Sequence, residues 1–72
     1  MDFPARLINL RQSKQLTQKQ LASDLSLSEV AVQNYENRRR KPTFDILISL
    51  ADYFNVSLDY LVGRSENSEI NR

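Results

Sequence analysis

Two neighbouring amide side chains, Gln33 and Asn34, point most directly to a function for this chain of 72 residues. An amide carries a hydrogen-bond donor beside an acceptor, which matches the edge that adenine presents in the DNA major groove. Glu29 and Val30 precede them by one helical turn, so a helix would place all four on one face. A carboxylate can accept from a cytosine amine, and a valine can contact a thymine methyl group. The four residues therefore suggest a surface that reads base pairs.

A run of four cations follows these residues directly. The run is Arg38–Lys41, and Pro42 closes it. Like charges repel one another and proline disfavours helix at the residue before it, so this segment is predicted to be a loop. A solvated loop without a partner is the plainer interpretation. Because the loop is anchored to the preceding helix, however, ordering it on DNA costs less than ordering a free tail, and we expect it to contact phosphates.

The proposed reading residues also have plainer interpretations, and these stay open at this point. Amides are common on solvated helix faces, and Glu29 also favours the positive end of a helix dipole. Val30 can belong to the core, although Val32 and Tyr35 already define an inward face.

The composition argues against catalysis and against metal binding. The chain has no histidine and no cysteine, which removes the commonest general base and the commonest metal ligands. Asp45 and Asp52 are seven residues apart and can share a helix face, but helix-terminal and solvent roles suffice for them. We therefore predict no enzymatic activity, no cofactor and no small-molecule ligand. No apolar run approaches the roughly 18 residues of a membrane span, and no signal peptide is visible, so a cytoplasmic protein without a membrane partner is expected.

The charges are divided unevenly along the chain. Residues 1–41 contain eight Lys or Arg and four acids, whereas residues 42–72 contain two basic residues and five acids. The positive half is the half that contains the amides. Such asymmetry indicates one surface that meets phosphates and another that faces away from them.

Five helices are predicted to position these residues, over 4–14, 18–24, 29–37, 44–54 and 58–62, and no strand is predicted. Thr17 and Gln20 have the spacing of a capping box at the start of the second helix. Glycine is favoured where a helix ends in a left-handed conformation, which suits Gly63, and Asn55 is expected to end the fourth helix. The other predicted helix-starting caps are Ser28, Thr43 and Ser57.

The apolar spacing within these helices predicts one core and one domain. We expect one helical domain over 1–64, in which two short helices joined by a tight turn occupy 17–38, and a polar, flexible tail over 65–72. The predicted core residues are Phe3, Leu7, Leu10, Leu21, Ala22, Leu25, Val32, Tyr35, Phe44, Leu47, Leu50, Ala51 and Phe54.

Three segments give the chain a family resemblance. They are RLINLRQSKQLTQKQLA, LSEVAVQNYENRRRKPT and LISLADYFNVSLDYLVGR, and together they cover about residues 5–64. The chain resembles the DNA-binding domain of the phage-repressor and Cro-like helix-turn-helix family, also called the xenobiotic-response-element family. This resemblance implies an all-α, lambda-repressor-like five-helix bundle. In such proteins the third helix lies in the major groove and the second crosses the DNA backbone above it.

The resemblance also implies roles for individual residues. An ion pair is expected between Arg11 and Glu36. Ser26 stands in the turn where the family usually has a left-handed glycine, at a cost of roughly 1 kcal/mol. Gln18 is expected to contact a phosphate and to brace a recognition side chain. The implied base contacts are Glu29, Val30, Gln33 and Asn34, and the implied backbone contacts are Gln18, Ser28, Asn37, Arg39, Arg40 and Lys41.

The function implied is sequence-specific regulation of transcription from a double-stranded DNA operator, most simply repression by occupying a promoter. One module of this size buries roughly 600–1,000 Å² on DNA, so we expect a homodimer, at least on the operator. By the resemblance, Leu58, Tyr60 and Leu61 form the dimer contact, although Leu61 also suits the core. The alternative is an antitoxin-like or co-regulator module that binds another protein. Such a module would carry apolar anchors where this chain has amides and cations.

Overall fold

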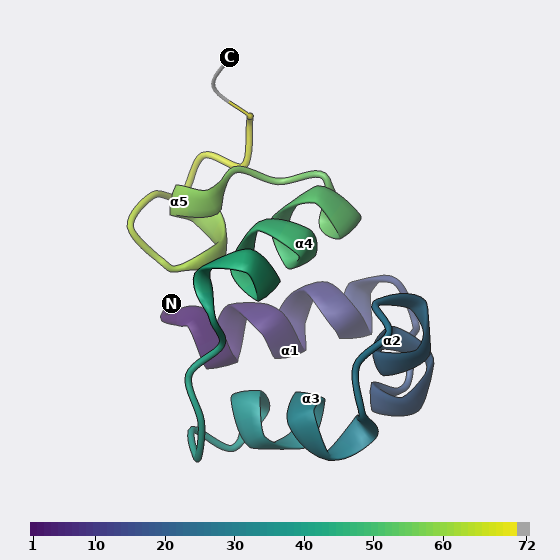
Figure 1. Ribbon diagram of the computed structural model, residues 1–72. Helices are drawn as coiled ribbons and strands as arrows, with labels where there is room; N and C mark the ends of the chain where they lie inside the picture. The colour runs from purple at the N-terminus through teal and green to yellow at the C-terminus, as the bar shows by residue number, and fades with distance from the viewer. Residues whose placement is uncertain (71–72) are drawn as a thin grey trace.

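The computed structural model describes residues 1–70, and these residues form five helices (Figure 1). The predicted ranges 18–24 and 44–54 match in full, and the helices predicted over 29–37 and 58–62 each end one residue earlier. The helix predicted over 4–14 both begins and ends one residue earlier. The all-α prediction is therefore confirmed. The helices are α1 (Phe3–Ser13), α2 (Gln18–Asp24), α3 (Glu29–Glu36), α4 (Phe44–Phe54) and α5 (Leu58–Leu61).

Each helix begins at a side chain that accepts a hydrogen bond from the backbone three residues later. The capping box of α2 is confirmed: Gln20 N donates to Thr17 Oγ1 at 3.0 Å, and Thr17 N donates to the Gln20 side chain at 2.8 Å. α1 begins one residue earlier than predicted because Asp2 caps it, accepting from Ala5 N. Such a cap satisfies one of the N–H groups that the first helical turn leaves unpaired. The remaining caps are Ser28, Thr43 and Ser57, as predicted.

α1 runs through the middle of the bundle, with α2 and α3 on one side and α4 and α5 on the other (Figure 1). It packs against α3 and α5, while α2 packs on α3 and α4 packs on α5. One apolar core holds these elements together. Its fully buried members are Leu7, Leu21, Val32, Leu50 and Leu61. Among the described residues, no helix is long and apolar enough to cross a membrane.

Two apolar residues lie in environments other than those predicted: one is exposed and the other is buried. Phe44 was predicted to lie in the core, but its exposed fraction is 65%. It is the first residue of α4, so it lies a turn beyond the point where that helix meets the core at Leu47 and Leu50. Leu61 was predicted as a dimer contact, but it is fully buried, because α5 packs against α1 and α4 and directs this side chain into the core.

A buried arginine ties the segment after α5 to the bundle, which the sequence analysis did not foresee. The Arg6 guanidinium lies 3.7 Å from the centre of the Tyr60 ring, and its Nε donates to the Tyr60 carbonyl at 3.1 Å. A second guanidinium nitrogen donates to Glu66 at 3.2 Å. Ser57 N also donates to the Ser68 carbonyl at 2.9 Å. Residues 66 and 68 of the expected flexible tail therefore contact the bundle, and its last two positions, 71–72, lie outside the described residues.

Candidate nucleic-acid interface

α3 presents the four proposed reading residues outward. Val30 is 60% exposed, Glu29 is exposed, and both Gln33 and Asn34 are partly exposed. The opposite side of the same helix is buried through Val32, Tyr35 and Glu36. The side chains that were predicted to meet base edges are therefore available to a partner, and α3 forms the edge of the molecule farthest from α5 (Figure 1).

The turn between α2 and α3 fixes the angle at which α3 leaves the bundle. Ser26 adopts the left-handed conformation with φ 56°, although it is not a glycine. Leu27 N donates to the Ala22 carbonyl at 2.8 Å, which closes the turn onto the end of α2. The geometry typical of the family is thus reached at a cost of roughly 1 kcal/mol in backbone strain.

A cluster of three polar residues ties α1, α2 and α3 together beneath the outward face of α3. The expected ion pair is confirmed: Arg11 donates to both carboxylate oxygens of Glu36, with Nε–Oε2 at 2.7 Å and Nη2–Oε1 at 3.1 Å. The Gln18 amide also donates to Glu36, at 2.9 Å. A planar guanidinium matches a carboxylate bidentately, so this contact fixes geometry as well as charge.

The position of Gln18 refines its expected role. Its side chain braces the buried Glu36, whereas the resemblance led us to expect bracing of a recognition side chain. The amide nitrogen carries two hydrogens, and Glu36 uses one of them. The second remains available at the start of α2, so the phosphate contact of Gln18 stays a prediction.

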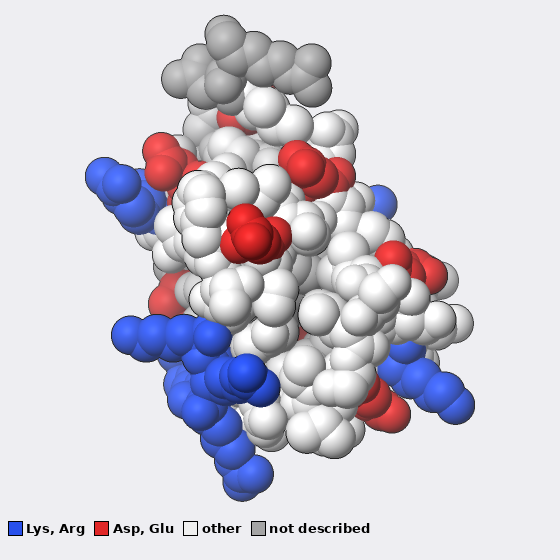
Figure 2. All heavy atoms as spheres, viewed as in Figure 1, with Lys and Arg blue, Asp and Glu red and all other residues white. Residues whose placement is uncertain are grey.

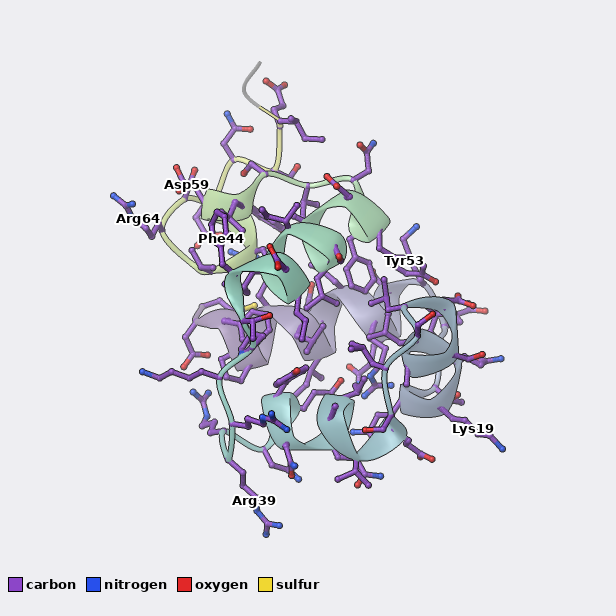
Figure 3. All side chains as sticks on the ribbon, viewed as in Figure 1. Lys19, Arg39, Phe44, Tyr53, Asp59 and Arg64 are labelled. Carbon is purple, nitrogen blue, oxygen red and sulfur yellow. The ribbon has the colours of Figure 1, made fainter. Side chains whose placement is uncertain are left out.

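The cationic loop begins with backbone bonds that attach it to α3. The N–H groups of Arg39 and Arg40 both donate to the Asn34 carbonyl, at 2.9 and 3.3 Å. The side chains of Arg39, Arg40 and Lys41 are exposed. Figure 3 shows Arg39 extending away from the body of the molecule at the lower edge, beside α3. Three exposed cations are thus carried on an anchored stretch of backbone.

A further exposed cation lies near the other end of α3, and it was not predicted from the sequence as a site residue. Lys19 lies near the start of α2 and is exposed, and Figure 3 shows it projecting outward on the side opposite Arg39. Its place just after a helix cap was the available signal, because such residues often lie on the surface. Figure 2 shows that Lys and Arg side chains gather toward the α3 edge, whereas most acidic side chains in this view lie nearer α4 and α5.

Arg38 differs from the other cations of the loop because it is paired. Its guanidinium donates to both carboxylate oxygens of Asp2, the residue that caps α1. The hydrogen bond from Arg38 holds the pKa of the Asp2 carboxyl below its ordinary value. A lowered folded-state pKa means that the pair favours the folded protein above the ordinary value, and that this contribution is lost as pH falls through the folded pKa.

Residues 1–70 hold no group of three acidic, histidine or cysteine side chains placed to bind a metal ion. What the geometry offers is a helix edge with amides at its centre and cations at both ends. Amides offer hydrogen bonds to base edges, and cations attract the flanking phosphates. Such an arrangement suits a partner whose negative charges repeat along its length, as phosphates do in a nucleic acid.

Comparison with known proteins supports this interpretation. A family model described as helix-turn-helix matches residues 7–61. The chain is 39% identical over 71 residues to the HTH-type transcriptional regulator ImmR of Bacillus subtilis (strain 168), covering 99% of this chain and 56% of ImmR. It is 34% identical over 73 residues to the cryptic phage CTXphi transcriptional repressor RstR of Vibrio cholerae serotype O1, covering 97% of this chain and 65% of RstR. The chain thus spans between about half and two thirds of the length of these relatives.

A solved structure shares the same fold. The P22 c2 repressor protein, crystallised in complex with synthetic operator 9T, matches with a TM-score of 0.82 over 90% of this chain and 98% of that chain. The sequences are 23% identical, so the likeness concerns the fold. The expected lambda-repressor-like bundle is therefore confirmed.

Proposed function

Because this chain belongs to the helix-turn-helix family of phage-repressor and Cro-like proteins, we propose that it binds a double-stranded DNA operator and regulates transcription there. In this proposal α3 enters the major groove and α2 crosses the backbone above it. The chain acts in the cytoplasm, where it meets that DNA, and it acts as a binding protein without catalysis. Repression by occupying a promoter is the simplest mode, and the repressor RstR among the relatives supports it.

One observation carries the proposal. The outward side of α3 offers Gln33 and Asn34 at its centre, with Lys19 near one end and the exposed loop cations after the other. In the proposal each amide bonds an adenine, Val30 contacts a thymine methyl and Glu29 accepts from a cytosine amine. The proposed backbone contacts are Gln18, Ser28, Asn37, Arg39, Arg40 and Lys41, joined by Lys19.

We also propose that the chain works as a homodimer on its operator. Two copies related by a two-fold axis would place their α3 helices in major grooves about 34 Å apart. The exposed Phe44 supports a contact around α5, together with the partly exposed Leu58 and Tyr60. Asp59 and Arg64, which pair with each other at 4.0 Å, lie on the same side as Phe44 (Figure 3), so a two-fold axis there can also bring Asp59 of one copy near Arg64 of the other.

Binding to DNA is tested by titrating the chain with mixed genomic fragments at two salt concentrations. We expect binding that weakens as salt rises, by about 0.9 in log–log slope for each phosphate contacted. Operator sequences are then selected from a random duplex pool. Absence of binding even at low salt would contradict the proposal and would favour the alternative, a module that grips another protein.

Two matched substitutions separate base reading from backbone contact. Gln33→Ala is expected to cost about 1–3 kcal/mol of discrimination at one or two operator positions, because it removes a bidentate bond to a base. Arg39→Ala is expected to weaken every duplex alike and to reduce the salt slope by about 0.9. Selection of operators from the random pool with each variant measures both effects. Equal losses for both variants on all sequences would contradict the assignment of base reading to α3.

A further inference from the structure

Asp2 and Arg38 are separated by 36 positions in the sequence but form a two-pronged ion pair in the fold. Arg38 is the first residue of the cationic loop, and its neighbours Arg39 and Arg40 are exposed. Of the acidic side chains in residues 1–70, Asp2 is the one that pairs with this loop. The Asp2 carboxylate thus accepts the paired guanidinium hydrogen bonds of Arg38 that could otherwise bind a DNA phosphate.

Asp2 is held in place by two further hydrogen bonds. Its side chain accepts from Ala5 N at 3.3 Å, and its carbonyl accepts from Arg6 N at 2.9 Å. The preceding residue, Met1, lies against Gly63, where an added Cβ would come within 2.1 Å of the Met1 carbonyl oxygen. Gly63, two residues after α5, therefore leaves the space that the Met1 carbonyl occupies.

Asp2 lines one pocket together with three cationic residues, Arg38, Arg40 and Lys41, and with several apolar residues. One carboxylate therefore shares this pocket with three cationic residues, and its ion pair is with Arg38. Arg38 is also constrained by its backbone, since its φ of 66° lies in the left-handed region. A phosphate that approaches the loop therefore meets one cation that is already engaged and three that are free of such a pair among the described residues.

We propose that Arg38 is a phosphate-binding residue of the DNA interface and that Asp2 is its built-in competitor, which lowers the affinity of the free protein for all duplexes. The inference rests on the proposed DNA binding and adds a regulating residue outside the reading helix. When DNA binds, Arg38 can stay with Asp2, and one phosphate contact is then missing. Alternatively, Arg38 can move to a phosphate, and the unpaired Asp2 carboxylate then takes up a cation from solution. In both cases fewer counterions are released in total than four phosphate contacts by the loop cations would release.

Asp2→Asn tests this competition with little change in shape. Asparagine caps a helix as well as aspartate does, so α1 is kept while the charge is removed. We expect Asp2→Asn to bind an unrelated duplex and the selected operator more tightly by the same factor. Its log–log salt slope should be steeper by about 0.9, equivalent to about a 3.5-fold greater loss of affinity between 50 and 200 mM salt. Fluorescence anisotropy on a labelled duplex measures both quantities.

Two further variants show whether the effect passes through Arg38. Asp52→Asn removes the same charge from an exposed position on α4, across α1 from α3, and should leave the salt slope unchanged (Figure 1). Asp2→Asn combined with Arg38→Gln should return the slope to that of the original chain. Thermal melting by circular dichroism establishes that each variant is folded.

The outcomes separate this inference from the proposed function. If the original chain binds DNA and Asp2→Asn behaves like Asp52→Asn, the competition by Asp2 is wrong while DNA binding stands. A gain that persists after Arg38→Gln would also overturn it, because the carboxylate would then act on other cations. If the original chain binds no duplex at 50 mM salt, both proposals fall together.

Discussion

Glu36 is buried, yet its hydrogen bonds help to fix the position of α3, whose outward side is the proposed DNA-reading surface. Its carboxylate accepts two hydrogen bonds from Arg11 and one from Gln18, and its side chain is 4% exposed. These bonds join α1, at the centre of the bundle, to the start of α2 and the end of α3. A buried carboxylate is tolerated here because its partners satisfy it.

We expect Glu36→Gln to destabilise the protein strongly. The amide keeps the volume of the side chain, but it leaves the Arg11 guanidinium without a counter-charge at a side-chain exposure of 14%. Removing one partner of a buried pair costs about 3 kcal/mol, and chemical denaturation would measure it. Asp59→Asn is the matched control, because its pair with Arg64 is exposed on both sides and is worth under about 1 kcal/mol. Similar losses in the free energy of unfolding for both variants would show that burial does not make the Arg11–Glu36 pair more stabilising than an exposed pair.

At the scale of elements, the two turns that flank α3 both place a non-glycine residue in the left-handed region. Ser26 precedes α3 with φ 56°, and Arg38 follows it with φ 66°. The helix that would read DNA is therefore bounded by backbone that is strained on both sides. Packing of α3 against α2 and α1 holds these conformations in place.

The strain at Ser26 predicts opposite effects for one kind of substitution at two positions. Ser26→Gly should raise the free energy of unfolding by up to about 1 kcal/mol, because glycine adopts the left-handed conformation without steric cost. Ser23→Gly, three residues earlier and exposed within α2, should lower it by up to about 1 kcal/mol, since glycine is a poor helix former. Urea titrations of the two variants give the comparison. A loss of stability in Ser26→Gly would mean that the serine contributes more than its backbone conformation suggests.

At the scale of the whole molecule, the α3 edge and the α5 region have different characters. The α3 edge is polar and basic, whereas the opposite side bears the exposed Phe44 beside α5 (Figures 2 and 3). A single exposed apolar residue is ordinary on a protein surface, so Phe44 alone shows no interface. Its place on the same side of the molecule as Asp59 and Arg64 (Figure 3) makes it the first residue to test for dimerisation.

Phe44→Ser is expected to weaken pairing of the chain while leaving its fold unchanged. The ring is 65% exposed, so the melting temperature should change little. Binding to an operator with two half-sites should weaken by about tenfold or more, equivalent to roughly 1.4 kcal/mol or above, because an aromatic contact between copies is lost. Binding to a duplex with one half-site should be unaffected, and this comparison is the internal control. If Phe44→Ser binds the duplex with two half-sites as tightly as the original chain does, a dimer through Phe44 is contradicted.

The sequence alone determined the helices, the starting caps of all but α1, and the outward side of α3. These features depend on neighbours within one or two turns: the Thr17–Gln20 capping box, the left-handed Asn55 and the alternation of Val30 with Val32 are all local patterns. The Arg11–Glu36 pair was predicted as well, but only through the family resemblance.

Tertiary structure decided what happens where the ends of different elements meet. It turned Phe44 outward, buried Leu61, and paired Arg6 with residues after α5. It also set Asp2 on Arg38, although neither residue is near the other in the chain. No local pattern specifies these outcomes, because they depend on how the helices pack and on which distant charges that packing brings within hydrogen-bond distance.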